Sequence, residues 1–283
     1  MMTDKTPDLS YCADYVRRHD RDRFLCALFA RPERREDLFV LYAFHQEISK
    51  TREMVSEAML GHIRLQWWRD TLSGIEQGDV RKHEVVEPLA ALITSGRVAR
   101  KDLEAVIDAR EFDLADTAPE SIPALEQYVD QTSGHLAAMA AGVLGATNVE
   151  AKDAARRAGL AYGMVGILRA MVFHGRAKRL YMPQDRIAEH KVAQGDLFEF
   201  RGTEPVRALV RELAETAQSH IKAARKMRRD LPKMALPAAL PLVLAEGYLK
   251  KLEKSGFDPF SAEFGLARPA SFMLTLRGII GRL

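Results

Sequence analysis

GLAYGMVGILRAMVFHGRAKRLYMPQD, residues 159–185, predicts the helix around which the rest of the chain is organised. Its apolar residues recur at the three- and four-residue spacing of one helix face. They are Leu160, Met164, Ile167, Leu168 and Met171. Gly159, Gly163 and Gly166 leave another face almost without side chains. A neighbouring helix or a long ligand can therefore approach that face closely.

This helix is expected to end near His174, because Gly175 stands at a typical helix terminus and Pro183 follows soon after. Three cations come directly behind it, and they are called the basic mouth below: Arg176, Lys178 and Arg179. Positive charge is thus predicted to gather at the C-terminal end of the central helix.

The composition is that of a soluble chain with an ample core. Of 283 residues, 47% are hydrophobic and 29% are charged. No apolar run reaches the roughly 18–20 residues that span a bilayer, and residues 1–8 are polar and acidic, unlike a targeting peptide. A cytoplasmic protein is therefore expected. Cys12 and Cys26 are too few for a disulfide framework or a cysteine-based metal site, so both are predicted to be buried.

The charge balance excludes one class of partner. A net charge of +3 permits contact with anionic lipid or diphosphate, yet 42 basic residues face 39 acidic ones on a mixed surface. Aromatic residues make up 7% of the chain and do not interleave a basic stripe. No nucleic-acid partner is expected.

Nearly every segment longer than ten residues has helical periodicity, and none alternates like a strand, which predicts an all-α fold. A single domain over residues 1–283 is expected, since no repeat or change of composition divides the chain. The predicted helices cover residues 8–19, 33–57, 61–76, 84–95, 100–116, 122–144, 150–174, 204–230 and 236–255, with a short one after Pro269. A polar loop containing Gly195 and Gly202 follows the central helix, and Pro241 should kink the helix that contains it.

Residues 159–185 resemble the second signature of the squalene/phytoene synthase family. The positions in register with that signature are Ala161, Ile167, Leu168, Arg169, Arg179, Tyr181 and Pro183, with Met182 in place of its leucine. The family places two aspartates there to hold Mg²⁺, but this chain has Ala170 and His174. Mg²⁺ prefers carboxylate and water oxygens in octahedral geometry, which neither residue supplies.

The first aspartate-rich motif of the family is similar to LYAFHQEISKTRE, residues 41–53. Its aspartate positions correspond here to Ser49, Lys50 and Glu53, so only Glu53 keeps a carboxylate. The ammonium of Lys50 would repel a metal ion, or alternatively would replace it as a counter-ion for diphosphate.

The resemblance covers most of the chain, through RLQWWR at 64–69, EFDL at 111–114, residues 128–145 and residues 249–260. A serine-rich phosphate-contacting segment of the family is replaced by RDRF at 21–24. A further set of segments together resembles one branch of the superfamily, which contains a mitochondrial respiratory complex I assembly factor. They are residues 11–12, 24–26, 43–44, 55–57, 64–68, 168–170 and 174–175. This resemblance implies an isoprenoid-synthase-like bundle around a central pocket, with complex I subunits or assembly proteins as partners. It also implies a peripheral position at an inner membrane, and an isoprenoid or anionic lipid as ligand.

The resemblance also implies what catalysis would need. Ionising an allylic diphosphate requires metal ions between two carboxylate clusters, and losing one stabilising group costs on the order of 10²–10³ in rate. We therefore expect no catalytic residues, no metal and no cofactor. The degenerate motif positions are Ser49, Lys50, Glu53, Ala170 and His174. The alternative is an active Mg²⁺-dependent head-to-head prenyl diphosphate synthase with relocated ligands, namely Glu47, Glu53, Glu57 and Asp185.

Several polar residues have two interpretations. The candidates for diphosphate binding are Lys50, Arg169, Arg179 and Tyr181, and the candidate pocket acids are Glu47, Glu53 and Glu57. Arg169 either binds an anion or forms an ion pair with one of those acids, since a buried arginine requires a partner. His174 is either a metal ligand or a helix-terminal group that interacts with the helix dipole, and the second interpretation is favoured.

Two further expectations concern surfaces and space. Trp67 and Trp68 are neighbours on a helix and cannot both face one core, so one should be partly exposed and contribute to a binding face. A lipid-binding role through the basic mouth is a third hypothesis for function. Without metal and diphosphate, large side chains are free to fill the pocket, and the candidates are Met164, Met171 and Phe173.

Overall fold

The computed structural model describes residues 9–115, 117–265, 271–281 and 283. Within these ranges the chain forms helices and no strand, which confirms the all-α prediction. The α-helices are α1 (Tyr11–His19), α2 (Arg21–Ala27), α3 (Pro32–Ser49), α4 (Ala58–Glu76), α5 (Val86–Thr94), α6 (Arg100–Ala109), α7 (Ile122–Val129), α8 (His135–Val143), α9 (Val149–Arg169), α10 (Met171–Arg176), α11 (Gln184–Glu189), α12 (Gln194–Phe198), α13 (Glu204–Lys226), α14 (Leu236–Ala239), α15 (Pro241–Lys254), α16 (Ala262–Gly265) and α17 (Ser271–Ile280). Shorter elements are η1 (Thr51–Met54), η2 (Arg110–Leu114), the π-helical turn η3 (Asp130–Gly134) and η4 (Lys233–Ala235). The predicted helix limits at Asp8 and Asp116, and Pro269, lie outside the described residues.

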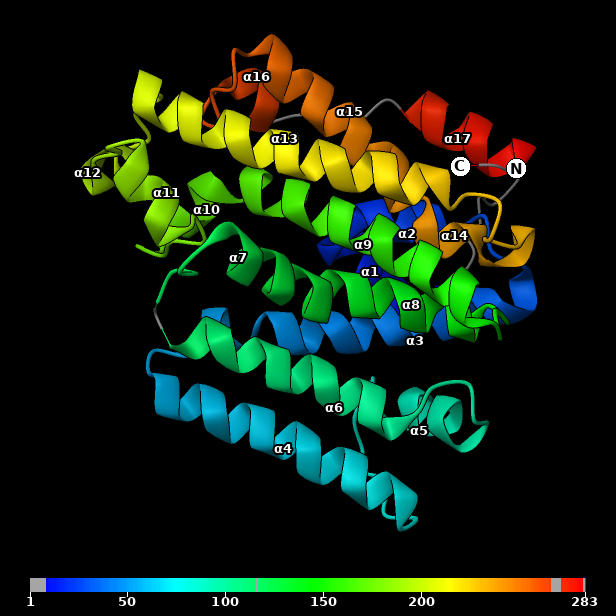
Figure 1. Ribbon diagram of the computed structural model, residues 1–283. Coiled ribbons are helices and arrows are strands. Elements are labelled where there is room, and N and C mark those ends of the chain that lie inside the picture. The colour runs from blue at the N-terminus through cyan, green and yellow to red at the C-terminus, as the bar shows by residue number, and fades with distance from the viewer. Residues whose placement is uncertain (1–8, 116, 266–270, 282) are drawn as a thin grey trace, which may run out of the picture.

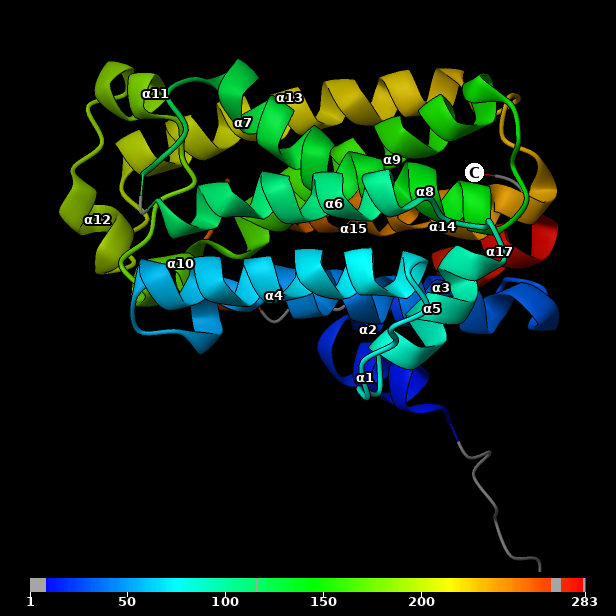
Figure 2. The same cartoon turned by 90° about the horizontal axis from the view of Figure 1, so that it is seen from below.

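Helix α9 lies at the centre of the bundle, as expected. It packs against α13 and α15 on one side and against α8 and η3 on the other (Figure 1). Helices α3, α6 and α4 continue the layers to the far edge, and α10, α11 and α12 gather at one end (Figures 1 and 2). The end of the bundle that carries α10 also carries the basic mouth.

The glycine face of α9 is used for close helix packing. A Cβ on Gly159 would lie 2.5 Å from the Ser133 carbonyl oxygen, and one on Gly163 would lie 2.5 Å from Val129 Cγ1. Gly166 differs, because a Cβ there would meet no atom within 4 Å. The predicted close approach is therefore confirmed for the first two glycines, and the partner is a helix.

Several long predicted helices are interrupted in the structure, including the one over 100–116, in which α6 ends at Ala109 and η2 follows. The one predicted over 33–57 ends at Ser49, because Lys50 and the turn η1 lead into an extended backbone at Val55. The one predicted over 122–144 contains the turn η3. The central helix ends at Arg169, and α10 begins at Met171 after a turn at Ala170.

The helical segment ends close to the predicted limit at His174, but Gly175 is not the residue that terminates it. Helix α10 continues to Arg176, and the chain reverses at Lys178, which has a φ of 54°. Gly175 instead permits close packing, because a Cβ there would lie 2.8 Å from the Phe200 ring and 2.9 Å from the Leu197 carbonyl oxygen.

Other expectations on packing hold. Cys12 and Cys26 are buried, and Trp68 is buried while Trp67 is partly exposed. Pro241 separates α14 from α15, as a missing backbone donor requires. The short helices α2, α11 and α12 were not predicted, because segments of five to seven residues are too short to show periodicity. None of the helices in the described ranges is long and apolar enough to cross a membrane.

Candidate functional site

The side chains at the first-motif positions have different surroundings. Ser49 Oγ donates a hydrogen bond to the Gln46 carbonyl oxygen at 3.2 Å and so serves the end of α3. The ammonium of Lys50 lies 5.1 Å from the centre of the Tyr15 ring on α1, and burial lowers its pKa. Glu53 is exposed in η1. Desolvation raises the pKa of its carboxyl, and the positive charge of Lys50 lowers it by less.

The other two pocket acids differ in burial and in partners. Glu47 is nearly buried, and its carboxylate pairs with Arg64 on α4 and hydrogen-bonds Tyr15. Glu57 is exposed directly before α4. The three predicted pocket acids therefore do not form a single carboxylate cluster.

Arg169 forms an ion pair, but with a residue that the sequence did not suggest. Its Nη1 lies 3.1 Å from Asp22 Oδ2 on α2, and its guanidinium lies 3.5 Å from the centre of the Tyr248 ring. The predicted partners Glu47, Glu53 and Glu57 were wrong. The reason is that the unpredicted helix α2 places Asp22 beside the end of α9.

Asp22 binds two hydroxyl groups as well as Arg169. Tyr162 donates to its Oδ2 at 3.0 Å, and Tyr248 donates to the same oxygen at 2.9 Å. These four residues, Asp22, Tyr162, Arg169 and Tyr248, are called the Asp22 cluster below. The arginine is thus held by a carboxylate and an aromatic ring.

A second pair lies next to the Asp22 cluster. Asp20 Oδ2 accepts hydrogen bonds from Arg23 Nη1 at 2.7 Å and from Gln46 Nε2 at 3.1 Å. Arg23 also donates to Ser133 Oγ at 3.1 Å. Asp22 and Arg23 of the RDRF segment therefore both form hydrogen bonds with side chains of the same chain.

A third network centres on the buried carboxylate of Asp113 in η2. Its Oδ1 accepts hydrogen bonds from the hydroxyls of Tyr128 and Tyr181, each at 2.7 Å. Its Oδ2 accepts from Arg110 Nη1 at 3.1 Å, and Arg110 also donates to the Tyr128 hydroxyl at 2.7 Å. Burial raises the pKa of both tyrosines above their usual range. We call Arg110, Asp113, Tyr128 and Tyr181 the Asp113 cluster.

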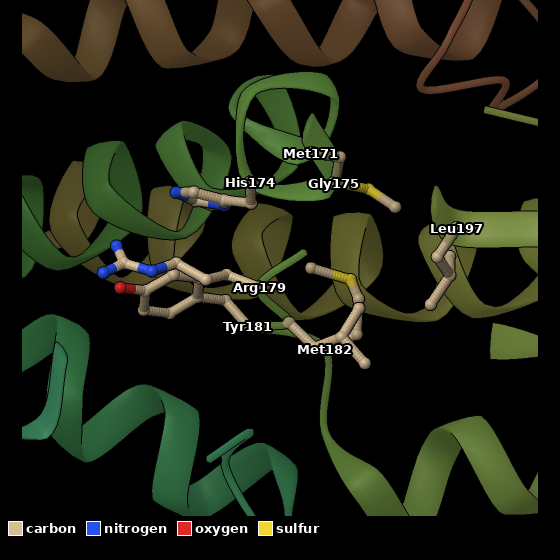
Figure 3. A pocket seen from close by; sticks show the side chains of 8 residues that line it. Met171, His174, Gly175, Arg179, Tyr181, Met182 and Leu197 are labelled. Carbon is tan, nitrogen blue, oxygen red and sulfur yellow. The ribbon is translucent and has the colours of Figure 1, made fainter. Parts of the chain in front are cut away.

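His174 and Arg179 border this cluster, and their side chains extend beside Tyr181 (Figure 3). The His174 ring lies 4.4 Å from the Tyr181 ring, and Arg179 Nη2 donates to the Asp113 carbonyl oxygen at 3.4 Å. Burial lowers the pKa of His174 to about 4, and Asp113 only partly opposes that effect. His174 lies in the last turn of α10, as the helix-terminal interpretation expects, and its interaction with the helix dipole stays a prediction.

The space beside His174 is small. Met171, Met182 and Leu197 lie on its apolar side (Figure 3), and its free volume is about 10 Å³, close to what one water molecule needs. Met164 and Met171 are buried, as expected for side chains that fill the interior. Phe173 is 49% exposed, so the expectation that it also fills the space was wrong.

The residues at the motif positions do not fit Mg²⁺. Ala170 has no donor atom, His174 offers nitrogen, and Lys50 brings a positive charge. Asp185, an alternative ligand, is exposed at the start of α11 and lies 3.3 Å from Arg186. The part of the chain that the structure describes brings together no group of three or more His, Cys, Asp or Glu side chains suited to a metal ion.

Comparison with known sequences identifies the family. The family model described as squalene/phytoene synthase matches residues 16–272. The chain belongs to the squalene/phytoene synthase family. Within it, the chain is 34% identical to a bovine protein named NADH dehydrogenase (ubiquinone) complex I, assembly factor 6, over 88% of this chain and 75% of that protein.

Solved structures of squalene synthases and their relatives share the fold. A dehydrosqualene synthase matches with a TM-score of 0.82 and 16% identity, over 95% of this chain and 94% of that one. The squalene synthase HpnC from Alicyclobacillus acidocaldarius matches with a TM-score of 0.77 and 17% identity, over 88% and 94%. These similarities establish the isoprenoid-synthase bundle.

Sequence reasoning missed four residues that build the polar interior of this squalene/phytoene synthase relative: Asp22, Arg110, Asp113 and Tyr128. Asp22 lies in the RDRF segment, which differs from the family sequence, and Asp113 lies in the EFDL segment, which resembles it. The only signal in the sequence was that each of these two segments contains an aspartate. The partners of both aspartates lie on other helices, so the segments alone did not reveal the two clusters.

Proposed function

We propose that this chain is a catalytically inactive member of its family that acts as an assembly or accessory factor for respiratory complex I. One observation supports the loss of catalysis most directly. The polar groups at the motif end of the bundle pair with one another, Asp22 with Arg169 and Asp113 with Arg110. Arg169 and Tyr181, two candidates for diphosphate binding, are used in these contacts.

The chemistry of the family reaction supports the same conclusion. Ionisation of an allylic diphosphate leaves charge that metal ions must neutralise as it develops. Of the five degenerate motif positions, only Glu53 has a carboxylate, and Glu47 is committed to Arg64. Replacing several such groups costs many orders of magnitude in rate, at about 10²–10³ for each.

The partner rests on similarity to the bovine protein named as a complex I assembly factor. Under this proposal, complex I subunits or assembly proteins bind the exterior of the bundle at the inner face of a membrane. An isoprenoid or anionic lipid is the proposed ligand, with Lys50, Arg169, Arg179 and Tyr181 as candidate contacts. No metal or cofactor is part of the proposal.

The catalytic half is tested by measuring diphosphate release from farnesyl and geranylgeranyl diphosphates with Mg²⁺ or Mn²⁺. We expect no release, while a dehydrosqualene synthase assayed beside it releases diphosphate. Mg²⁺-dependent release that Glu53→Gln abolishes would establish the alternative, an active head-to-head synthase. A thermal-shift titration with the same ligands separates binding from turnover, because a ligand that binds only the folded state raises Tm.

The assembly half is tested in a strain of the source organism that lacks this chain. Native gels stained for NADH dehydrogenase activity should show less assembled complex I, and the wild-type gene should restore it. Glu53→Gln should restore it equally well, because no metal ligand is required. An unchanged complex I level in the null strain would contradict the proposal.

A further inference from the structure

Helix α17 packs on the bundle through a narrow inner face. Leu274 is 2% exposed, and Gly278 lies directly against the Phe29 ring, where a Cβ would collide. The helix contacts α15 and lies at the periphery of the bundle in both views (Figures 1 and 2). It is far from α10, α11 and α12, so it marks the end of the molecule opposite the basic mouth.

The outer face of α17 is apolar and exposed to water. Its large side chains follow helical spacing along one side: Phe272, Met273, Leu276, Ile279 and Ile280. Phe272 is 72% exposed and Ile279 is 75% exposed, although both are strongly hydrophobic. A contiguous apolar surface of this kind is costly in water and indicates an interaction site.

The turn between α13 and α14, which meets the chain through Lys233 just after α17, is mainly positive. Residues 226–234 contain four cations and one acid, and the exposed members include Arg228, Arg229 and Lys233. The Lys233 side chain runs 3.6 Å from where a Cβ on Gly281 would lie, just after α17. The only charged residue on α17 itself is Arg277. An apolar helix face next to cations is complementary to a bilayer with anionic headgroups.

We propose that α17 docks this protein on an anionic membrane surface. The helix lies in the plane of the interface, with Phe272 and Ile279 at the boundary between headgroups and acyl chains. Arg228, Arg229 and Lys233 contact the headgroups from the adjacent turn. A membrane fits better than a protein partner, because an apolar helix face with exposed cations beside it is the pattern of a helix that lies in an anionic interface. This docking surface goes beyond the proposed role in complex I assembly and does not depend on it.

The test is flotation of the full chain with phosphatidylcholine vesicles, with and without phosphatidylglycerol. Wild type should bind the anionic vesicles, more weakly as salt increases. The double variant Phe272→Ser/Ile279→Ser should bind at least about tenfold more weakly, because it removes the largest exposed apolar groups. Arg228→Gln/Lys233→Gln should also weaken binding on the order of tenfold, since each cation near the surface contributes several-fold. Val149→Ser is the matched control, because Val149 is 77% exposed on α9.

Thermal melting checks that each variant is folded, which is expected because the substituted side chains are exposed. The proposal is overturned if wild type does not float with anionic vesicles, or if Phe272→Ser/Ile279→Ser floats like wild type. It is also overturned if Met59→Ser/Ile63→Ser, which alters the exposed apolar residues of α4, abolishes flotation instead. A wild-type dimer that Phe272→Ser/Ile279→Ser converts to monomer would assign the face to a second copy of the chain.

Discussion

Asp22 and Arg169, 147 residues apart in the chain, form an ion pair in which Asp22 Oδ2 lies 3.1 Å from Arg169 Nη1. Arg169 lies in the segment that resembles the second family signature, and Asp22 lies in the RDRF segment. The pair therefore joins two segments that are far apart in the sequence. A carboxylate of the same chain neutralises the guanidinium, so no bound anion is required to balance its charge.

Arg169→Ala should lower the free energy of unfolding by about 1–3 kcal/mol, because it removes a hydrogen bond between charged groups and the contact with the Tyr248 ring. Arg169→Lys should recover only part of the loss, since a lysine cannot stack as a plane while pairing with Asp22. Urea unfolding followed by circular dichroism measures both. Equal stability of Arg169→Ala and wild type would show that the pair is not structural.

Asp113→Asn should destabilise the fold by about 2–4 kcal/mol, because it leaves the largely buried Arg110 without its counter-charge. Tyr181→Phe is the milder comparison, at about 1 kcal/mol, since Asp113 keeps its other two donors. Both values come from urea denaturation. If Tyr181→Phe proved as damaging as Asp113→Asn, the charge of Asp113 would not be the dominant contribution.

Stability should fall as the pH drops from about 6.5 to about 4. His174 has a pKa of about 4 in the folded chain against an ordinary value of 6.5, so in this window the unfolded chain binds a proton that the folded chain does not. The expected slope is on the order of 1 kcal/mol per pH unit. Buried His45 adds to it in the same direction, because burial also lowers its pKa.

His174→Gln should reduce this slope without abolishing it, because His45 remains. The measurement is the urea midpoint at a series of pH values for wild type and variant. An NMR titration of wild type in which the His174 ring titrates near its ordinary value would contradict the prediction.

Two glycines of α9 should respond oppositely to alanine. Gly159→Ala should destabilise the protein by about 1–3 kcal/mol, because the new Cβ would lie 2.5 Å from the Ser133 carbonyl oxygen. Gly166→Ala should stabilise it by about 0.5–1 kcal/mol, because there is open space and alanine favours the helix. Thermal melting of the two variants compares them directly. Destabilisation by both would mean that the space beside Gly166 is filled in solution.

The sequence by itself determined the fold class, the central helix and the loss of motif acids. Apolar spacing along residues 159–171 is a local property, and so is the identity of Ala170 or Lys50 at a motif position. Such features can be recognised without knowing which residues lie beside them in the folded chain. The close approach at Gly159 and Gly163 was predictable for the same reason.

Only the tertiary structure decided which charges meet. Asp22 lies on a seven-residue helix that is too short to show periodicity, and its partners come from α9 and α15. Asp113 likewise gathers Tyr128 and Tyr181 from separate elements. Several acids could have paired with Arg169, and their spacing along the chain does not tell which of them does. The packing of α2 on α3 and α15 decides it, because it brings Asp22 within 3.1 Å of Arg169 and an ion pair depends on distance in space.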